Sequence, residues 1–313
     1  MRVLIAEFMD QAAVASLRRR FATTFDAGLV DRRAELLGAV RAADALIVRN
    51  RVRVDAELLA AAGRLRVVGR LGVGLDNIDL PACAARGIEV IPATGANALA
   101  VAEYVLGAAL VLLRGAYYST AAVADGDWPR AALSAGRELS GKILGVIGFG
   151  SIGRETGRLA RALGMRVVGC DTQIAASSPL WAEQHTLPHS LDELLRAADV
   201  VSMHVPLTDA TRHLIGGAEL ARMQYDAILI NTARGGIVDE TAVAAALRAG
   251  RLGGAALDVF VTEPLPGASV LADCPNLLLT PHVAGVTRES NVRVSTLIAE
   301  QVVAALDAVR QRS

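Results

Sequence analysis

Three side chains in the second half of the sequence could together interconvert a ketone and an alcohol: Arg234, Glu263 and His282. A histidine can give or take the hydroxyl proton near neutral pH, and a nearby carboxylate stabilises its charged form. An arginine can hold a substrate carboxylate through two parallel hydrogen bonds. These residues follow expected strands at 228–231, 255–258 and 277–280, and the carboxyl ends of parallel strands share one edge of a sheet. We therefore expect them at one edge.

Each of these residues also has a structural interpretation. Arg234 and Glu263 could form a structural ion pair, because clustered charges are only probabilistic markers of a site. A single histidine is more often surface or hydrogen-bonded filler, which is our interpretation of His185, His189, His204 and His213. Metal binding is not expected, because Pro188 argues against a helix face shared by His185 and His189 and no cysteine lies near them.

A glycine loop lies upstream of these residues, between Lys142 and Asp171. An apolar run at 143–147 is typical of a buried strand, and a helical segment and a second strand follow. Between them stand Gly148, Gly150 and Gly153 in the spacing G-x-G-x-x-G. In such a unit the glycines permit a tight turn, a close approach to a pyrophosphate and close helix packing. The stretch predicts a dinucleotide site, the alternative being a glycine-rich turn that binds nothing.

Asp171 ends this unit and bears on the choice of dinucleotide. A carboxylate there can accept hydrogen bonds from both ribose hydroxyls. It would repel a 2′-phosphate, so NAD is expected rather than NADP. Asp258, at another strand end, is expected to accept from the nicotinamide amide.

Strands and helical segments alternate along the whole chain, which predicts an α/β fold with two doubly wound parallel sheets. A turn-rich boundary is expected at 91–96. A long, mostly apolar helix is expected from Asn97 to about Val123, buried between domains or against another subunit. A second glycine cluster, Gly69 to Gly74, is interpreted as a loop that offers backbone N–H groups to a small anion.

The composition narrows the classes of function. The 313 residues carry 32 basic and 32 acidic side chains, so no general attraction to nucleic acid or membrane is expected. The three cysteines are far apart and odd in number, and no signal peptide is expected at the N-terminus. These features indicate a cytoplasmic protein.

Several longer motifs surround the candidate residues: Gly148-Phe-Gly-Ser-Ile-Gly153 with Asp171, Asn231-Thr-Ala-Arg-Gly-Gly-Ile-Val-Asp239, Asp258-Val-Phe-x-x-Glu263-Pro, Pro281-His-x-Ala-Gly285 and Val73-Gly-Leu-Asp-Asn-Ile-Asp79. Together they resemble the D-isomer-specific 2-hydroxyacid dehydrogenases over nearly the whole chain. The resemblance implies a flavodoxin-like substrate domain of residues 1–96 and 286–313, split by a Rossmann-type NAD-binding domain of residues 97–285. It also implies an active site in the cleft between them and a homodimer through the nucleotide domain.

The resemblance assigns roles by position. It makes Arg234, Glu263 and His282 catalytic. The substrate carboxylate would meet Arg234 and the backbone of Gly72, Val73 and Gly74, with Asn97 at the hinge. Implied cofactor contacts, besides the glycines and Asp171, are Ser151, Ile152, Val205, Pro206, Thr211, Thr232, Ala233, Asp258 and Gly285.

The resemblance to phosphoglycerate-type members of the family implies that Arg49 and Arg70 in the first domain face the far end of the substrate. A basic cluster there, with Arg51 and Arg53, suits a second anionic group, and the alternative is a solvated basic rim. Within the family the pattern is most similar to sulfolactate dehydrogenases, with 3-phosphoglycerate as the rival substrate. The same pattern is compatible with a hydroxypyruvate or glyoxylate reductase and with a non-catalytic, NAD-sensing corepressor.

Overall fold

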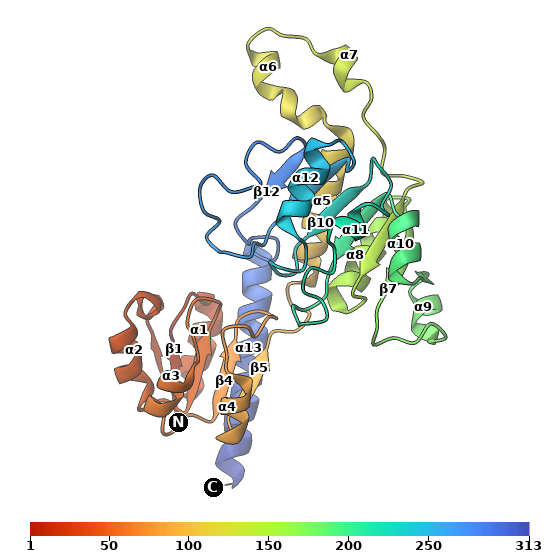
Figure 1. The fold of residues 1–313 in the computed structure, drawn as a ribbon. Helices are drawn as coiled ribbons and strands as arrows, with labels where there is room; N and C mark the ends of the chain where they lie inside the picture. The colour runs from red at the N-terminus through yellow and green to blue at the C-terminus, as the bar shows by residue number, and fades with distance from the viewer. Residues whose placement is uncertain (313) are drawn as a thin grey trace. The chain divides into compact units, whose positions relative to one another are not determined.

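The computed structural model describes residues 1–312, and the fold is drawn in Figure 1. Its contacts divide the chain into two compact units. The first unit comprises Met1–Asn97 and the chain from Val286 onward, and the second comprises Ala98–Gly285. Each unit is an α/β structure around a parallel sheet, so the expected fold class is confirmed.

The sheet of the first unit has the strand order β2-β1-β3-β4-β5, and all described pairings are parallel. The order reverses direction between β1 and β3, which makes the carboxyl ends of these two strands a topological switch point. The strands are β1 (Arg2–Ile5), β2 (Ala22–Phe25), β3 (Ala45–Val48), β4 (Val67–Arg70) and β5 (Glu89–Pro92).

Helices cover both faces of this sheet, because alternate strand residues point to opposite sides. Val3 and Ile5 pack in one apolar cluster with α1 and α13, whereas Leu4 packs in the other with α2, α3 and α4. The helices are α1 (Gln11–Arg20), the 3-10 helix η1 (Ala27–Asp31), α2 (Arg33–Val40), α3 (Ala56–Ala61), α4 (Leu80–Ala85) and α13 (Arg288–Arg312).

The C-terminal helix α13 packs closely on strand β4 at Gly69. A Cβ at Gly69 would lie 2.8 Å from Ile298 Cγ2 and 2.9 Å from Val302 Cγ2, closer than real Cβ contacts allow. Ile298 and Val302 are themselves fully buried. The absence of a side chain at Gly69 therefore sets the distance at which the helix docks.

The sheet of the second unit has the order β12-β11-β10-β9-β6-β7-β8, again with parallel pairings throughout the described strands. Its switch point lies between β6 and β9, where the order reverses. The strands are β6 (Ile143–Ile147), β7 (Arg166–Cys170), β8 (Leu187–Pro188), β9 (Val200–Met203), β10 (Ile228–Asn231), β11 (Gly254–Leu257) and β12 (Leu277–Leu279).

Two apolar clusters fill the faces of this second sheet. One lies under α5 and α8, and the other lies under α10, α11 and α12. The helices are α5 (Ala98–Arg114), η2 (Ala116–Ser119), α6 (Thr120–Ala124), α7 (Arg130–Leu133), α8 (Ser151–Ala162), α9 (Pro179–Glu183), α10 (Leu191–Ala197), α11 (Gly217–Leu220) and α12 (Glu240–Arg248).

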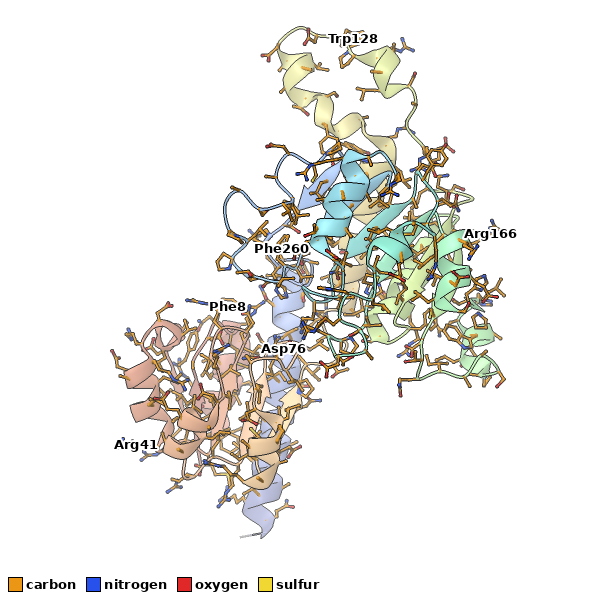
Figure 2. All side chains as sticks on the ribbon, viewed as in Figure 1. Phe8, Arg41, Asp76, Trp128, Arg166 and Phe260 are labelled. Carbon is orange, nitrogen blue, oxygen red and sulfur yellow. The ribbon has the colours of Figure 1, made fainter. Side chains whose placement is uncertain are left out.

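The helix expected from Asn97 to about Val123 is shorter than predicted. Helix α5 ends at Arg114, and Gly115 follows with a φ of 65°, a left-handed conformation that terminates a helix. The chain then forms an arm of η2, α6 and α7, which extends away from the sheet of its own unit (Figure 1). Trp128 lies near the end of this arm (Figure 2) and is 77% exposed.

Helix α5 buries its apolar face within its own unit, against α8 and strands β10 and β11. Among the described residues, no single helix is long and apolar enough to span a membrane, although α5 taken together with the bent continuation Ala116–Ala124 reaches that length and composition.

We predict that Gly69→Ala lowers the free energy of unfolding by about 1–3 kcal/mol, because overpacking forces α13 away from β4. Thermal unfolding should show a lower Tm, and a second change, Val302→Ala, should restore part of the loss. Gly38→Ala is the matched control. A Cβ at Gly38 in α2 meets nothing within 4 Å, so this change should raise stability by about 0.5–1 kcal/mol. Equal effects of the two alanines would contradict the packing argument.

Candidate active site

The glycine loop joins β6 to α8 at the switch point of the second sheet. Gly148 has a φ of 91°, and a Cβ there would lie 2.7 Å from the His204 carbonyl. A Cβ at Gly153 would lie 2.2 Å from the Gly148 oxygen, so helix and loop are in close contact. A Cβ at Gly150 would meet nothing within 4 Å, which leaves its backbone open to a ligand. The loop thus has the glycine roles of a pyrophosphate site, with Ser151 and Ile152 in the first turn of α8.

Asp171 lies beside this loop at the end of β7. Its Oδ2 accepts from the Phe149 N–H at 2.8 Å, and its Oδ1 accepts from the Gln173 N–H at 2.8 Å. Each carboxylate oxygen has two lone pairs, so both can accept a further hydrogen bond. The carboxylate is therefore oriented by backbone and still able to bind a ribose diol.

The loops after β9 and β10 border the same switch point. Thr211 Oγ1 donates to the Pro206 carbonyl at 2.6 Å, which closes a turn, and a Cβ at Gly148 would lie 2.9 Å from Val205. Thr232 follows β10, and its buried Oγ1 has no hydrogen-bond partner among the described residues. An orphaned buried hydroxyl is costly and suggests a ligand that completes its hydrogen bonding. These observations fit a dinucleotide.

Asn231 braces the loop that carries Arg234. Its Oδ1 accepts from the Ala233 N–H, and its Nδ2 donates to the Arg234 carbonyl, both at 3.0 Å. The Arg234 Nη1 donates to the Ala233 carbonyl at 2.6 Å. Gly235 allows the loop to approach the next one, because a Cβ there would lie 1.9 Å from the Phe260 oxygen. The amide of Asn231 has a role that the sequence analysis missed, although its position at a strand end is a usable signal.

His282 and Glu263 form a pair at the carboxyl edge of the second sheet. The His282 Nδ1 lies 2.8 Å from Glu263 Oε2, and Glu263 Oε1 accepts from the Phe260 N–H at 3.0 Å. About a third of each side chain is exposed, 38% and 37% respectively. The hydrogen bond at Nδ1 fixes the ring and leaves Nε2 for a substrate hydroxyl.

Asp258 is 1% exposed and accepts three hydrogen bonds. Oδ1 accepts from Thr280 Oγ1 at 2.6 Å and from the Val283 N–H at 2.8 Å, and Oδ2 accepts from the Ala284 N–H at 2.8 Å. One lone pair of Oδ2 remains for the nicotinamide contact that the sequence suggested. The carboxylate mainly holds the backbone next to His282 in place. This segment of the chain continues to Gly285.

Arg49 lies at the switch point of the first unit, directly after β3. Its Nη2 donates to Asn291 Oδ1 at 2.8 Å, and its guanidinium lies 6.0 Å from the ring centroid of Phe8 (Figure 2), which follows β1. Burial lowers the pKa of Arg49, and the negative charge of Glu7 opposes this shift. No ion pair joins Arg49 to a carboxylate in the described part of the chain.

Glu7 is 5% exposed and holds the loop that begins with Arg49. It accepts from the N–H groups of Arg49, Val52 and Arg51, at 2.7, 3.0 and 3.3 Å. Asn77 braces the same loop, because its Nδ2 donates to the Val52 carbonyl at 2.6 Å. Neither Glu7 nor Asn291 was predicted from the sequence as a partner of Arg49 or its loop.

Fewer arginines around Arg49 lack a partner in the structure than the sequence suggested. Arg51 is exposed and paired with Asp31, so its charge is largely compensated. Arg70 bonds through Nη1 to the Leu71 carbonyl at 3.2 Å. Arg49 is thus the half-buried cation of this region that lacks a carboxylate partner among residues 1–312.

The loop from Gly72 to Gly74 offers fewer N–H groups than expected. The Gly72 N–H donates to the Arg70 carbonyl at 2.8 Å and is therefore used locally. Those of Val73 and Gly74 have no partner among the described residues and remain available to a carboxylate. Asn97, at the end of this unit's first segment, has a buried Oδ1 without a partner in the described structure. No cluster of three or more potential metal ligands occurs in residues 1–312.

Comparison with known proteins agrees with this geometry. Residues 106–284 match the family model of the D-isomer specific 2-hydroxyacid dehydrogenase NAD binding domain. An (S)-sulfolactate dehydrogenase from Chromohalobacter salexigens is 55% identical over 304 residues, covering 97% of this chain and 98% of the relative. A D-3-phosphoglycerate dehydrogenase from Methanocaldococcus jannaschii is 38% identical over 96% of this chain, which corresponds to 56% of that protein's length.

Solved structures match nearly the whole chain as well. A protein from Thermus thermophilus matches with a TM-score of 0.88 and 37% identity, covering 98% of this chain and 97% of the other. A D-lactate dehydrogenase from Aquifex aeolicus, complexed with NAD and lactic acid, matches with a TM-score of 0.83 and 28% identity, covering 98% and 96%. The chain belongs to the D-isomer-specific 2-hydroxyacid dehydrogenase family.

Proposed function

We propose that this NAD-dependent 2-hydroxyacid dehydrogenase interconverts (S)-sulfolactate and sulfopyruvate. The pair of His282 and Glu263, 2.8 Å apart at the carboxyl edge of the NAD-binding sheet, is the observation that carries the proposed chemistry. The sulfolactate dehydrogenase of Chromohalobacter salexigens, 55% identical, supports the choice of acid. The first unit would supply substrate recognition, and the second binds NAD.

NAD supplies the hydride acceptor for oxidation and, when reduced, the hydride donor for reduction. In the oxidation, His282 Nε2 takes the proton of the substrate hydroxyl while Nδ1 stays bonded to Glu263. Glu263 stabilises the imidazolium that results and is itself held by the Phe260 N–H. Arg234 would hold the substrate carboxylate and polarise the adjacent carbonyl in the reverse direction.

The Chromohalobacter salexigens relative is named for (S)-sulfolactate, and this is consistent with a family named for D isomers. In lactate the carboxylate outranks the methyl group in the naming priorities. In sulfolactate the carbon that bears sulfur outranks the carboxylate. One spatial arrangement of hydroxyl, carboxylate and third carbon is therefore named R in D-lactate and S in sulfolactate, so the same face of the carbonyl receives hydride.

Charge favours a sulfonate over a phosphate at Arg49. A sulfonate carries one negative charge, whereas a phosphate monoester carries about 1.5–2 at pH 7. The partner of Arg49, Asn291, is neutral, and the nearby carboxylate of Glu7 reduces the positive potential at the guanidinium. A monoanion therefore matches this arrangement better, and sulfolactate is preferred to 3-phosphoglycerate.

The first test of the proposal is steady-state NADH oxidation with sulfopyruvate, phosphohydroxypyruvate, hydroxypyruvate and glyoxylate. We expect the highest kcat/KM with sulfopyruvate.

His282→Asn should lower kcat about 10²–10⁴-fold, because this is the usual contribution of general acid–base catalysis. Asparagine is the suitable replacement because His282 has a φ of 56°, which asparagine tolerates. Preference for hydroxypyruvate or glyoxylate would refute the substrate assignment, and turnover unaffected by His282→Asn would refute the catalytic one.

The second test separates the far end of the substrate from its reacting end. Arg49→Ala should raise KM for sulfopyruvate and phosphohydroxypyruvate about 10–100-fold, because each loses one charged hydrogen-bonding partner. KM for glyoxylate should change little, because glyoxylate has no second anionic group. Arg51→Ala is the control, because Arg51 is exposed and paired with Asp31. An equal loss for all three acids would contradict the role of Arg49.

We further propose that the enzyme is a cytoplasmic homodimer that associates through the arm of η2, α6 and α7. The arm exposes Tyr117, Tyr118, Val123 and Trp128, and apolar residues of the arm, including Trp128 and Leu133, line a surface pocket. Clustered exposed aromatic side chains are typical of interfaces. The three free cysteines suit a reducing compartment.

Trp128→Arg should therefore shift the protein from dimer to monomer in analytical ultracentrifugation. Tyr225→Arg is the matched control, since Tyr225 is also 77% exposed but lies outside the arm. A monomeric wild-type protein, or a dimer that survives Trp128→Arg unchanged, would disprove association through the arm.

A further inference from the structure

We propose that Tyr104 and Thr280, which have no assigned role in the reaction, are positioning residues that hold His282 in its working orientation through Asp258. The proposal rests on the acid–base role of His282 given above. It starts from a continuous series of short hydrogen bonds: Tyr104 OH to Thr280 Oγ1 at 2.6 Å, and Thr280 Oγ1 to Asp258 Oδ1 at 2.6 Å.

The direction of these hydrogen bonds follows from the chemistry of the groups. An ionised carboxylate only accepts, so the single hydroxyl proton of Thr280 must point to Asp258. Tyr104 must then donate its own proton to the Thr280 oxygen. Burial raises the pKa of Tyr104, which keeps the phenol protonated and able to donate. The series is therefore ordered, with helix α5 at its donor end.

Asp258 links this series to the backbone of His282 and of the two residues that follow it. Its carboxylate accepts from the N–H groups of Val283 and Ala284, and its own carbonyl accepts from the His282 N–H at 2.8 Å. Among the described residues, the four hydrogen-bond partners of the carboxylate and carbonyl all belong to the segment 280–284. Because the carboxylate is 1% exposed, water cannot easily replace a partner that is removed.

His282 needs such support because its backbone is in an unfavourable conformation. Its φ is 56°, in the left-handed region that residues other than glycine rarely occupy. Conformations of this kind persist only where the surroundings over-determine them. The hydrogen bonds of Asp258 hold the backbone, while Glu263 holds the ring at Nδ1. Loss of the Tyr104–Thr280 end should let the segment relax and move Nε2 away from the substrate hydroxyl.

Three variants test the series through the rate of sulfopyruvate reduction. Thr280→Val removes the hydroxyl with little change in shape and should lower kcat about 10–100-fold, the range for a misplacement of about 1 Å. Tyr104→Phe, which leaves the Thr280–Asp258 bond intact, should have a smaller effect of about 3–10-fold, and Thr280→Ser should retain wild-type kcat. Tyr225→Phe is the control, because Tyr225 is an exposed phenol outside the arm.

A double-variant comparison shows whether the effect acts through His282. If it does, Thr280→Val should change the residual rate of His282→Asn by less than about 2-fold, since groups that act as a unit are not additive. The NADH dissociation constant, measured by fluorescence, should stay unchanged in all variants. The proposal would be overturned if Thr280→Val lowered the rate of the His282→Asn enzyme as much as it lowers the rate of the wild type. It would also be overturned if Thr280→Val alone had the wild-type kcat.

A measurement without turnover keeps the outcome independent of substrate choice. The chain has five histidines, so isotope labelling of histidine gives an assignable NMR spectrum. We expect a downfield Nδ1 proton from the His282–Glu263 bond in wild type and Thr280→Ser, and its loss or broadening in Thr280→Val. Retention of this signal in Thr280→Val would refute the positioning role even if the enzyme prefers another acid. Loss of the signal together with full activity of His282→Asn would instead refute the proposed catalysis.

Discussion

Buried carboxylates that accept backbone N–H groups hold the loops of both units in place. Parallel strands end at one edge of a sheet, and the residues beyond them have no neighbouring strand to satisfy their N–H groups. Glu7 binds three such groups after β3, and Asp258 binds two after β12. Each carboxylate lies at a strand end itself, so it joins neighbouring loops. The geometry of Arg49 and His282 depends on this arrangement.

Because the carboxylate of Glu7 binds backbone N–H groups, the positive charge of Arg49 stays available to an anionic ligand. The carboxylate oxygens of Glu7 accept hydrogen bonds from backbone N–H groups. The side chain of Arg49 instead forms a hydrogen bond with the neutral Asn291. A partly desolvated guanidinium without a carboxylate partner gains more from a bound anion than an ion-paired one does. Arg51, only two residues away, is exposed and paired with Asp31. The difference between the two arginines comes from their environment, since their chemistry is the same.

The sequence predicted the elements well where their signals were local. Short apolar runs located most strands, and the G-x-G-x-x-G spacing located the loop at the second switch point. The end of α5 at Gly115 was missed because alanine-rich helical periodicity continues beyond it, and a lone glycine inside such a pattern is ambiguous. Glu7 and Asn291 were missed for a different reason. They meet Arg49 across 42 and 242 residues of sequence, and no periodic pattern reports contacts of that range.

The proposed roles divide between the two units. His282, Glu263 and the dinucleotide loops all lie in the second unit. In the proposed reaction they act on the hydroxyl and its carbon, which every 2-hydroxy acid shares. Arg49 and its supports Glu7 and Asn291 lie in the first unit. If Arg49 binds the substrate as we propose, a change of charge there alters which third carbon is accepted, while Asp258 and the segment it holds stay the same. Relatives named for sulfolactate, phosphoglycerate and lactate are therefore expected to differ mainly in the loops after β1 and β3 and at the start of α13.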